Sequence, residues 1–349
     1  MQVKTAKAAI LAQSREPLVV DEIALPETLG VGQVLVKVLY STICGAQLNE
    51  IAAAKGPDKF LPHLLGHEAS AQVVEIGLGV TTVKPGDTVV LHWRPSQGIQ
   101  CQPPAYQWRG KKLNAGWVTT FNDYAVVSEN RMTVIPPDYN LRDAPLLGCA
   151  VTTAAGVINN DANVKIGESV VIFGVGGVGL NVVQFAELAG ANPIVAVDLV
   201  DAKLDMAKSR GATHCLNGNA VSDMDAEIRK IVGAKGPDKV IETTGAKSVI
   251  ELAYNLTHAD GTCVLVGVPS EKVSIYTLPI HFNKVLTGSH GGDAAPHVDI
   301  PRLIRLIEAG RLSFEGLITH EFPLDDINAA LDVVRSGTAG RVLLRIGQA

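Results

Sequence analysis

The stretch SVVIFGVGGVGLNVVQFAELAG, residues 169–190, decides the fold of this chain. An apolar run typical of a buried strand leads directly into GVGGVG, and an apolar helical pattern continues through Leu188. The spacing G-x-G-x-x-G between a strand and a helix indicates a dinucleotide-binding turn. The glycines make the tight turn, admit the pyrophosphate and let the helix pack on the strand, while the helix N-terminus offers free N–H groups. A merely tight turn is the alternative. The residues expected at the dinucleotide are Gly174, Gly176, Gly177, Val178 and Gly179.

A carboxylate follows at the place where the adenosine ribose is expected. The next apolar run, PIVAVD, ends in Asp198. A carboxylate here accepts hydrogen bonds from the ribose hydroxyls and repels a 2′-phosphate. No arginine comes directly after it, so the sequence favours NAD over NADP. The alternative role is a helix cap.

The order of the predicted strands and helices around this stretch indicates two domains. Residues 151–290 alternate strands with helices, which predicts a doubly wound parallel sheet of the Rossmann type in an α/β protein. Residues 1–150 are mostly β, with short runs such as VLVKVLYS, ASAQVVEIG and DTVVLHW. Two amphipathic helices and a strand, VLLRI, follow Gly288. We expect residues 291–349 to complete the first domain.

Composition excludes several classes of protein. A net charge of −5 argues against a nucleic-acid surface, and no apolar run is long enough to span a membrane. Five scattered cysteines do not form a disulfide framework and favour a reducing compartment. No signal peptide is recognisable. We therefore expect a cytoplasmic protein that has neither nucleic acid nor membrane as a partner.

Three residues far apart in the sequence are candidate metal ligands. Cys44, His67 and Cys149 would give zinc one nitrogen and two sulfur ligands, with a fourth position open as in a catalytic site. Their spacing alone proves little, because a single buried cysteine is more often an inert apolar residue than a ligand.

The segments around these residues resemble the zinc-containing medium-chain alcohol dehydrogenases. STICGAQ, GHE after PHLL, VKPGDTVV, LLGCAVTTAAG, GVGGVG, GATHCLN, VLVGVP and LITHEFPLDDINAALDVVRSG carry the resemblance, which covers essentially the whole chain. It implies a GroES-like, mostly-β catalytic domain beside the Rossmann domain. It also implies that Cys44, His67 and Cys149 bind the catalytic zinc and that Glu68 is the carboxylate next to the metal.

The same resemblance assigns three further residues to the cofactor. Thr153 matches a position near the nicotinamide, Lys203 one near the adenosine ribose, and Arg341 one at the pyrophosphate.

The sequence departs from the family in the segment after DTVV. Many relatives bind a second, structural zinc there with four cysteines, whereas residues 92–120 contain only Cys101. One thiolate does not complete a tetrahedral site, so we expect a single zinc per chain. The segment, interpreted as a lobe or long loop, would be held by packing of Trp93, Trp108 and Trp117.

A second departure concerns the proton that an alcohol loses on oxidation. Relatives usually have a hydroxyl residue at position 46 and an aspartate at 47, whereas this chain has Ala46 and Gln47, with Asn49 nearby. The proton could leave through water, a substrate hydroxyl, Glu50, His63 or Glu68. Gln47, Asn49 and Trp93 are the expected pocket residues, with His92 nearby, and they favour a polyol, sugar derivative or cyclitol as substrate.

The resulting prediction is zinc- and NAD-dependent oxidation of an alcohol to a ketone or aldehyde, by hydride transfer from a zinc-bound alkoxide. Two alternatives remain: a zinc-free NAD(P)H-dependent enoyl or quinone reductase, and a catalytically silent dinucleotide-binding protein. The resemblance also implies a homodimer or homotetramer, because in relatives the strand in TCVLVGVP lies near a sheet edge that pairs across a two-fold axis.

Overall fold

The computed structural model describes residues 1–347 and divides the chain into two compact units. One unit joins Met1–Cys149 with Ala295–Ala349, and the other is the contiguous segment Ala150–Ala294. The sequence places these boundaries after residue 150 and before residue 291. The second unit is therefore an insertion in the first.

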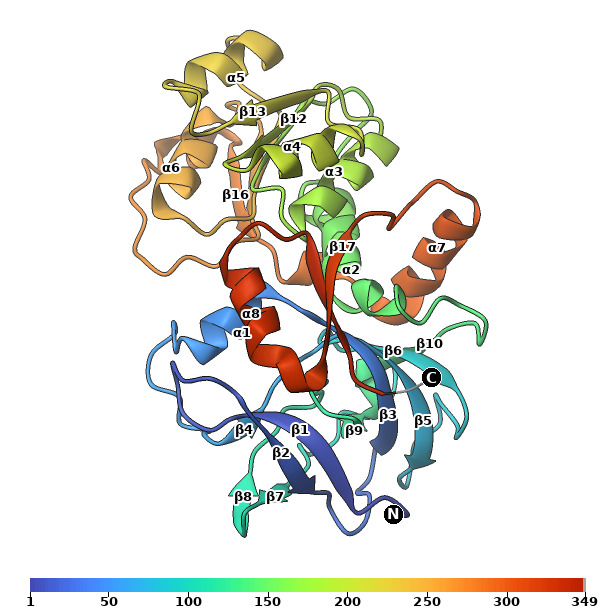
Figure 1. The fold of residues 1–349 in the computed structure, drawn as a ribbon. Helices are drawn as coiled ribbons and strands as arrows, with labels where there is room; N and C mark the ends of the chain where they lie inside the picture. The colour runs from blue at the N-terminus through green and yellow to red at the C-terminus, as the bar shows by residue number, and fades with distance from the viewer. Residues whose placement is uncertain (348–349) are drawn as a thin grey trace. The chain divides into compact units, whose positions relative to one another are not determined.

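The inserted unit is built on one parallel sheet, as the sequence predicts. Each pair of neighbouring strands is parallel, and the order is β13-β12-β11-β14-β15-β16 (Figure 1). The side chains of β11 are all buried, as expected for a parallel strand with both faces covered. The strands are β11 (Val170–Phe173), β12 (Ile194–Asp198), β13 (His214–Asn217), β14 (Lys239–Glu242), β15 (Thr262–Leu265) and β16 (Val285–Gly288).

Helices connect these strands and lie against the sheet. The helix predicted through Leu188 is α3, which begins at the last glycine of GVGGVG. The helices are α2 (Ala150–Gly156), α3 (Gly179–Leu188), α4 (Asp201–Lys208), α5 (Met224–Val232) and α6 (Lys247–Leu256), with short turns at Val157–Asp161, Leu278–Phe282 and Gly291–Asp293. The strand–turn–helix context of the glycine motif is thus present.

The other unit is mostly β, which confirms the predicted fold class. A five-stranded sheet has the order β4-β1-β2-β7-β8, and a seven-stranded sheet has the order β10-β6-β5-β3-β18-β17 with β9 paired to β3. The strands are β1 (Thr5–Leu11), β2 (Val19–Ala24), β3 (Gln33–Ile43), β4 (His63–Leu64), β5 (Ala69–Ile76), β6 (Thr88–Leu91), β7 (Tyr106–Trp108), β8 (Lys111–Leu113), β9 (Tyr124–Ser128), β10 (Met132–Val134), β17 (Ile318–Pro323) and β18 (Arg341–Arg345).

Strand β18 ties the end of the described chain to its beginning. It pairs antiparallel with β3, so that Val342 lies opposite Ile43. Amphipathic helices pack on this unit: α8 contributes buried Ile327 and Leu331 to a core shared with Ile43. The helices are α1 (Gly45–Ile51), α7 (Pro296–Glu308) and α8 (Ile327–Arg335), with 3-10 turns at Glu129–Arg131, Ala144–Gly148 and Leu324–Asp326.

The lobe at residues 92–120 contains more regular structure than the sequence analysis expected. Strands β7 and β8 form a hairpin in which Trp108 pairs with Lys111, and β7 joins β2 in the five-stranded sheet. The two residues between the strands, Arg109 and Gly110, both have positive φ, as a tight hairpin turn requires. The dipeptide Arg-Gly between β-rich runs was the signal that could have revealed it.

Two of the three tryptophans anchor the lobe by polar contacts; Trp108 also packs against a hydrophobic core, whereas Trp117 is 41% exposed. Trp108 Nε1 donates to Asp21 at 2.8 Å, and Trp117 Nε1 donates to the carbonyl of Cys101 at 3.1 Å. The Arg131 guanidinium lies 5.1 Å from the centre of the Trp117 ring, a cation–π contact.

A buried carboxylate that the sequence analysis missed also holds the lobe. Glu129 has no exposed surface, and its Oε1 accepts hydrogen bonds from the backbone N–H groups of Thr81 and Thr82 and from the Thr82 hydroxyl. Its Oε2 accepts from the N–H of Ile99 at 2.7 Å. Although burial opposes the charge, these four donors hold the pKa of Glu129 below its ordinary value.

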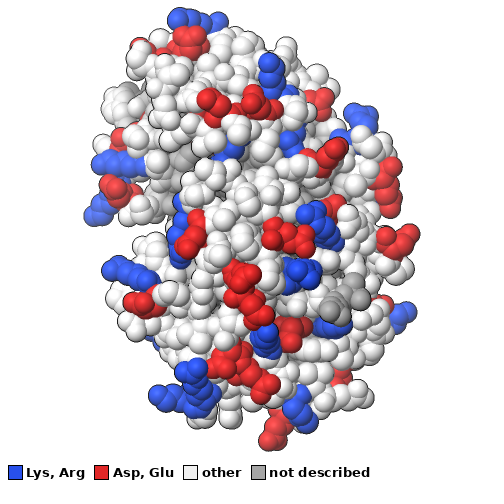
Figure 2. Space-filling model, viewed as in Figure 1, with Lys and Arg blue, Asp and Glu red and all other residues white. Residues whose placement is uncertain are grey.

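The surface carries both signs of charge. On the face in Figure 2, basic and acidic side chains alternate, and no broad region of one sign stands out.

Every helix in the described part of the chain is too short or too polar to cross a lipid bilayer.

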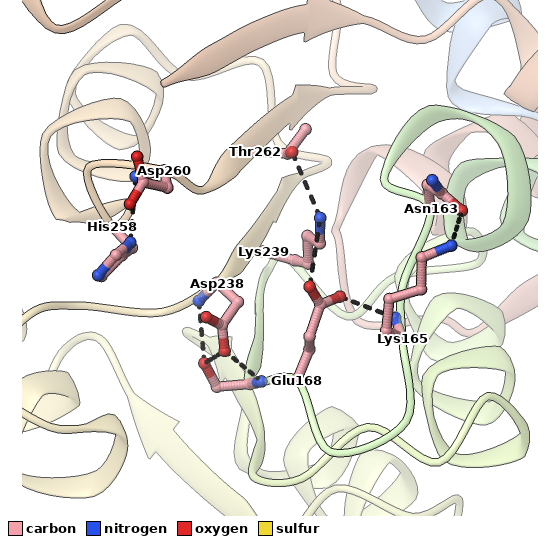
Figure 3. A network of polar contacts seen from close by, with 9 residues as sticks. Asn163, Lys165, Glu168, Asp238, Lys239, His258, Asp260 and Thr262 are labelled. Carbon is pink, nitrogen blue, oxygen red and sulfur yellow. Dashed lines mark hydrogen bonds and ion pairs between the residues drawn. The ribbon is translucent and has the colours of Figure 1, made fainter. Parts of the chain in front are cut away.

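A polar network ties neighbouring strands of the parallel sheet at the ends where they begin (Figure 3). The Asp238 carboxylate accepts from both the N–H and the hydroxyl of Ser169, and that hydroxyl accepts from the N–H of Asp238. Lys239 lies 3.7 Å from Glu168 and contacts the Thr262 hydroxyl. The contacts link β11, β14 and β15 at the edge opposite to the glycine turn.

Candidate functional site

The four residues that the resemblance places at the metal come together in the mostly-β unit. The ligand atoms of Cys44, His67, Glu68 and Cys149 all lie within 4.8 Å of one another. Cys44 follows β3 and caps α1, His67 and Glu68 precede β5, and Cys149 follows the turn Ala144–Gly148. Three segments that are distant in sequence therefore meet at one point.

Glycines permit this meeting at two positions. Gly66, directly before His67, has a φ of +88°, and a Cβ there would lie 2.3 Å from the Thr120 hydroxyl oxygen. Gly148 precedes Cys149, and a Cβ there would lie 2.4 Å from the carbonyl oxygen of Leu91. A side chain at either glycine would therefore force the backbone next to a cluster residue, or the neighbour that it meets, to shift.

The donor set fits zinc. Two thiols and one imidazole are the ligands of a catalytic zinc site with an open fourth position. His67 Nε2 is buried and has no hydrogen-bond partner among the described residues, and the same holds for Glu68 Oε2. Unpaired buried polar atoms are rare, and a metal ion would satisfy the imidazole nitrogen.

Charges within the cluster shift its titrations. The hydrogen bond from the Cys149 thiol, together with His67, holds the pKa of Cys44 well below its usual range. Burial opposes the imidazolium, but the Cys44 thiolate and Glu68 beside it raise the pKa of His67. Burial raises the pKa of Glu68 in spite of the guanidinium of Arg341. A thiolate is therefore readily formed at Cys44, whereas the hydrogen bond to Cys44 and burial raise the pKa of Cys149.

Arg341 lies beside this cluster and forms an ion pair with Glu68. Its Nη2 donates to Glu68 Oε1 and, at 3.0 Å, to the hydroxyl of Thr42. Its pKa is raised: burial opposes the charge, but Glu68 and the two cysteines outweigh it. Among the contacts of residues 1–347, Arg341 Nε has no partner. The resemblance had assigned this residue only to the pyrophosphate.

Gln47 connects two members of the cluster. Its Oε1 accepts from the backbone N–H of Cys44 at 3.0 Å, and its Nε2 lies 2.6 Å from Nδ1 of His67. Both ends of the amide are thus engaged within the site. Ala46 and Asn49 on the same helix are exposed, and Trp93 is half-buried with Arg94 5.8 Å from its ring centre.

Two histidines considered near the site have structural partners. His92 is fully buried, and its nitrogens contact the Arg94 carbonyl and the Thr133 hydroxyl, while burial lowers its pKa to about 4. His63 pairs with Asp58 at 2.8 Å and contacts the carbonyl of Leu64. Burial raises the pKa of Glu50, against the opposing charges of His63 and His67.

The glycine turn in the other unit is shaped for close approach of a ligand. Gly174 has a φ of +84°, and a Cβ on Gly179 would lie 2.0 Å from the Gly174 carbonyl oxygen. At Gly176 a Cβ would meet nothing within 4 Å, so the backbone faces open space there. Glycine is therefore required for the turn at two positions and leaves a free surface at the third.

Asp198 braces this turn. Its Oδ2 accepts from the N–H of Val175 at 2.8 Å, and its Oδ1 accepts from the N–H groups of Leu199 and Val200. The carboxylate retains lone pairs for a further donor. Thr153 is buried in α2, and Lys203 is half-buried in the first turn of α4.

Comparison with known proteins settles the family. Residues 30–137 match the model of the alcohol dehydrogenase GroES-like domain, and residues 177–309 match that of the zinc-binding dehydrogenases. An S-(hydroxymethyl)glutathione dehydrogenase of Escherichia coli is 32% identical over 97% of this chain and 99% of its own length. The chain belongs to the medium-chain zinc alcohol dehydrogenase family. This dehydrogenase is accordingly an oxidoreductase, as the sequence predicted, and the predicted family is confirmed.

Solved structures agree over the full length of the dehydrogenase. An alcohol dehydrogenase zinc-binding domain protein from Burkholderia ambifaria has a TM-score of 0.90 at 29% identity and covers 99% of this chain and 100% of its own. Benzyl alcohol dehydrogenase from Acinetobacter calcoaceticus has a TM-score of 0.88 at 27% identity with the same coverage. 2R,3R-butanediol dehydrogenase from Bacillus subtilis has a TM-score of 0.78 at 26% identity, covering 97% and 99%.

Proposed function

We propose that this dehydrogenase oxidises an alcohol to a ketone or aldehyde with NAD, at a zinc ion bound by Cys44, His67 and Cys149. The observation that carries the proposal is the convergence of two thiols on an imidazole whose Nε2 is buried and unpaired. A zinc-free reductase would have no use for this cluster, and a silent binding protein would have no reason to keep it.

The protein's own groups have distinct roles in this proposal. The zinc, when bound, supplies a Lewis acid that lowers the pKa of the alcohol, and the nicotinamide accepts the hydride. Glu68 lies in the cluster as a fourth possible metal ligand. Its ion pair with Arg341 competes with the metal for the carboxylate. The turn from Gly174 to Gly179 would bind the pyrophosphate through its N–H groups. By the resemblance, Arg341 would also contact the pyrophosphate, Thr153 the nicotinamide and Lys203 the ribose.

The substrate we propose carries a second hydroxyl group, as a polyol, sugar derivative or cyclitol does. Asn49 is exposed on α1 and has a free amide to offer, with Trp93 as a half-buried neighbour in the proposed pocket. The amide of Gln47 is engaged with the cluster, so it supports the pocket by holding His67. The similarity to a butanediol dehydrogenase agrees with a substrate of this kind.

The cofactor preference gives a direct test at Asp198. We expect kcat/KM with NAD to exceed that with NADP in the wild type, because the carboxylate repels a 2′-phosphate. Asp198→Asn removes the charge, and with its oxygen on the N–H of Val175 its amide nitrogen faces the N–H groups of Leu199 and Val200. It should lower kcat/KM with NAD by about 10-fold, because a hydrogen bond to a charged group is lost. The difference between kcat/KM with NAD and with NADP should therefore become smaller.

Asp201→Asn is the matched control, since Asp201 is exposed and lies three residues further along. It should leave the preference unchanged. Equal or better use of NADP by the wild type would remove the role assigned to Asp198, while the dehydrogenase function would stand.

We also propose a homodimer or homotetramer formed through the edge of the parallel sheet. One of the two outermost strands is β16, which lies next to β15, the strand that the sequence analysis expected near the edge. Large apolar side chains are exposed on and before it, which marks an interface. They are Val268, Tyr276, Leu278, Ile280, Phe282 and Val285.

Light scattering at micromolar concentration should therefore report at least a dimer. Phe282→Asp should shift the mass towards the monomer, because the new charge would be buried in the interface. Ile166→Asp, at an exposed apolar residue of the same unit outside this set, should not change the mass. A monomeric wild type would contradict the proposal.

A further inference from the structure

The amide of Gln47 bridges two zinc-ligand residues in a way that has consequences for the metal. Its oxygen takes the backbone N–H of Cys44 and its nitrogen faces Nδ1 of His67. Gln47 is only 2% exposed, whereas Cys44 and His67 are half-buried. The hydrogen bonds of this amide therefore act directly on two of the three proposed zinc ligands.

The tautomer of His67 decides what the amide must offer. A neutral imidazole carries a single N–H. If Nε2 binds a metal, that proton resides on Nδ1, which becomes a hydrogen-bond donor. The atom of Gln47 that lies 2.6 Å from Nδ1 is Nε2, which also only donates. The arrangement in the structure therefore suits the metal-free imidazole and opposes the metal-bound one.

Rotation of the amide does not remove the conflict. If Oε1 turns to His67, the amide nitrogen faces the N–H of Cys44, for which the described residues provide no other acceptor. An amide oxygen has two lone pairs, but the two partners lie at opposite ends of this amide, so one oxygen does not serve both. Two donors compete for one acceptor in either orientation, so Gln47 satisfies only one of them.

We propose that Gln47 weakens the hold of this site on zinc and keeps the metal exchangeable, because it offers one acceptor where two donors need one each. A carboxylate at the same place would accept from both. Gln47 is the third residue of α1, where a capping box takes glutamate as readily as glutamine, so the helix does not impose the amide. This inference rests on the proposed function, in which zinc binds to Cys44, His67 and Cys149.

The test compares zinc affinity and zinc release in the full-length protein, measured with a chelating dye. Gln47→Glu should lower the zinc Kd by about 10-fold, at the lower end of the effects known for groups that orient a metal ligand, and should slow release. Gln47→Met has a similar volume and accepts from neither donor, so it should bind zinc more weakly than the wild type. Asn49→Asp puts the same charge on the exposed part of α1 and should change the Kd by less than about threefold, since solvent and salt screen it.

Three results would each overturn the proposal. Gln47→Glu could bind zinc no more tightly than the wild type, or Asn49→Asp could lower the zinc Kd as much as Gln47→Glu does, which would make charge alone the cause. The third result is a zinc Kd of Gln47→Met equal to that of the wild type, which would decide the matter even if the glutamate variant failed to fold. A wild type that binds no zinc would instead refute the proposed function. The two failures are therefore distinguishable.

Discussion

Replacing Cys149 with alanine should release the zinc and reduce kcat/KM by roughly a thousandfold. The ion as a Lewis acid contributes several kcal/mol to the reaction, and each 1.36 kcal/mol corresponds to about tenfold in rate. Cys149 supplies one of the two thiols of the cluster. Cys44 and His67 would remain, and the Glu68 carboxylate that could replace the thiolate is paired with Arg341. The measurements are zinc per chain by elemental analysis and steady-state kinetics with a panel of alcohols and polyols.

The wild type should contain one zinc per chain, because residues 92–120 hold a single cysteine. Cys263→Ala is the matched control: Cys263 is buried, as Cys149 is, but lies in β15, in the other unit. It should keep its zinc. NAD binding should survive in Cys149→Ala, since the glycine turn belongs to a unit with its own core. Full zinc content in Cys149→Ala, or two zinc ions in the wild type, would contradict the assignment.

Replacing Glu129 with glutamine should lower the free energy of local unfolding of the lobe by about 2 kcal/mol. This is the order of magnitude of one lost hydrogen bond to a buried charged group. With Oε1 kept on Thr81 and Thr82, the amide nitrogen would face the N–H of Ile99, donor against donor. Hydrogen exchange at these amides should then be roughly 30-fold faster, at about tenfold per 1.36 kcal/mol.

The pH dependence of this protection should follow the same carboxylate. The pKa of Glu129 in the folded protein is held below its ordinary value. The ionised carboxylate therefore contributes its full stabilisation of the lobe above about pH 4.3, the pKa in the unfolded chain, and this stabilisation is lost as the pH falls through the lower pKa of the folded protein. Glu129→Gln should lack this dependence. Glu22→Gln, at an exposed residue of β2, should exchange like the wild type. Unchanged protection at Ile99 in Glu129→Gln would show that packing alone holds the lobe.

Features that arise from neighbours in the sequence were predictable. The strand, the glycine turn and the helix from Val170 to Leu188 follow from apolar periodicity and from the steric needs of the turn. The alternation of strands and helices gave the parallel sheet. For the metal cluster, residue types gave only candidates, and the resemblance selected Cys44, His67 and Cys149 from five cysteines and nine histidines.

Features that arise where distant segments meet were not predictable. Glu129 finds its donors at residues 81, 82 and 99, and no local pattern distinguishes it from a surface glutamate. His92 was considered a source of hydrogen bonds for substrate, but the carbonyl of Arg94 and the Thr133 hydroxyl engage both its nitrogens. The pairing of Arg341 with Glu68 joins residues 273 positions apart. Such contacts depend on strand register across the whole unit, which a single sequence does not encode visibly.

The pairing of β18 with β3 also fixes the order in which the nascent chain can be completed. All strands of the parallel sheet lie between residues 170 and 288, so the ribosome releases that unit whole before it makes β18. A chain synthesised only to residue 294 already holds Cys44, His67, Glu68 and Cys149 but lacks Arg341. Its Glu68 would then lie without the guanidinium that neutralises it. Translation therefore finishes the inserted unit first, and the cluster around Cys44 acquires Arg341 only with the last strand.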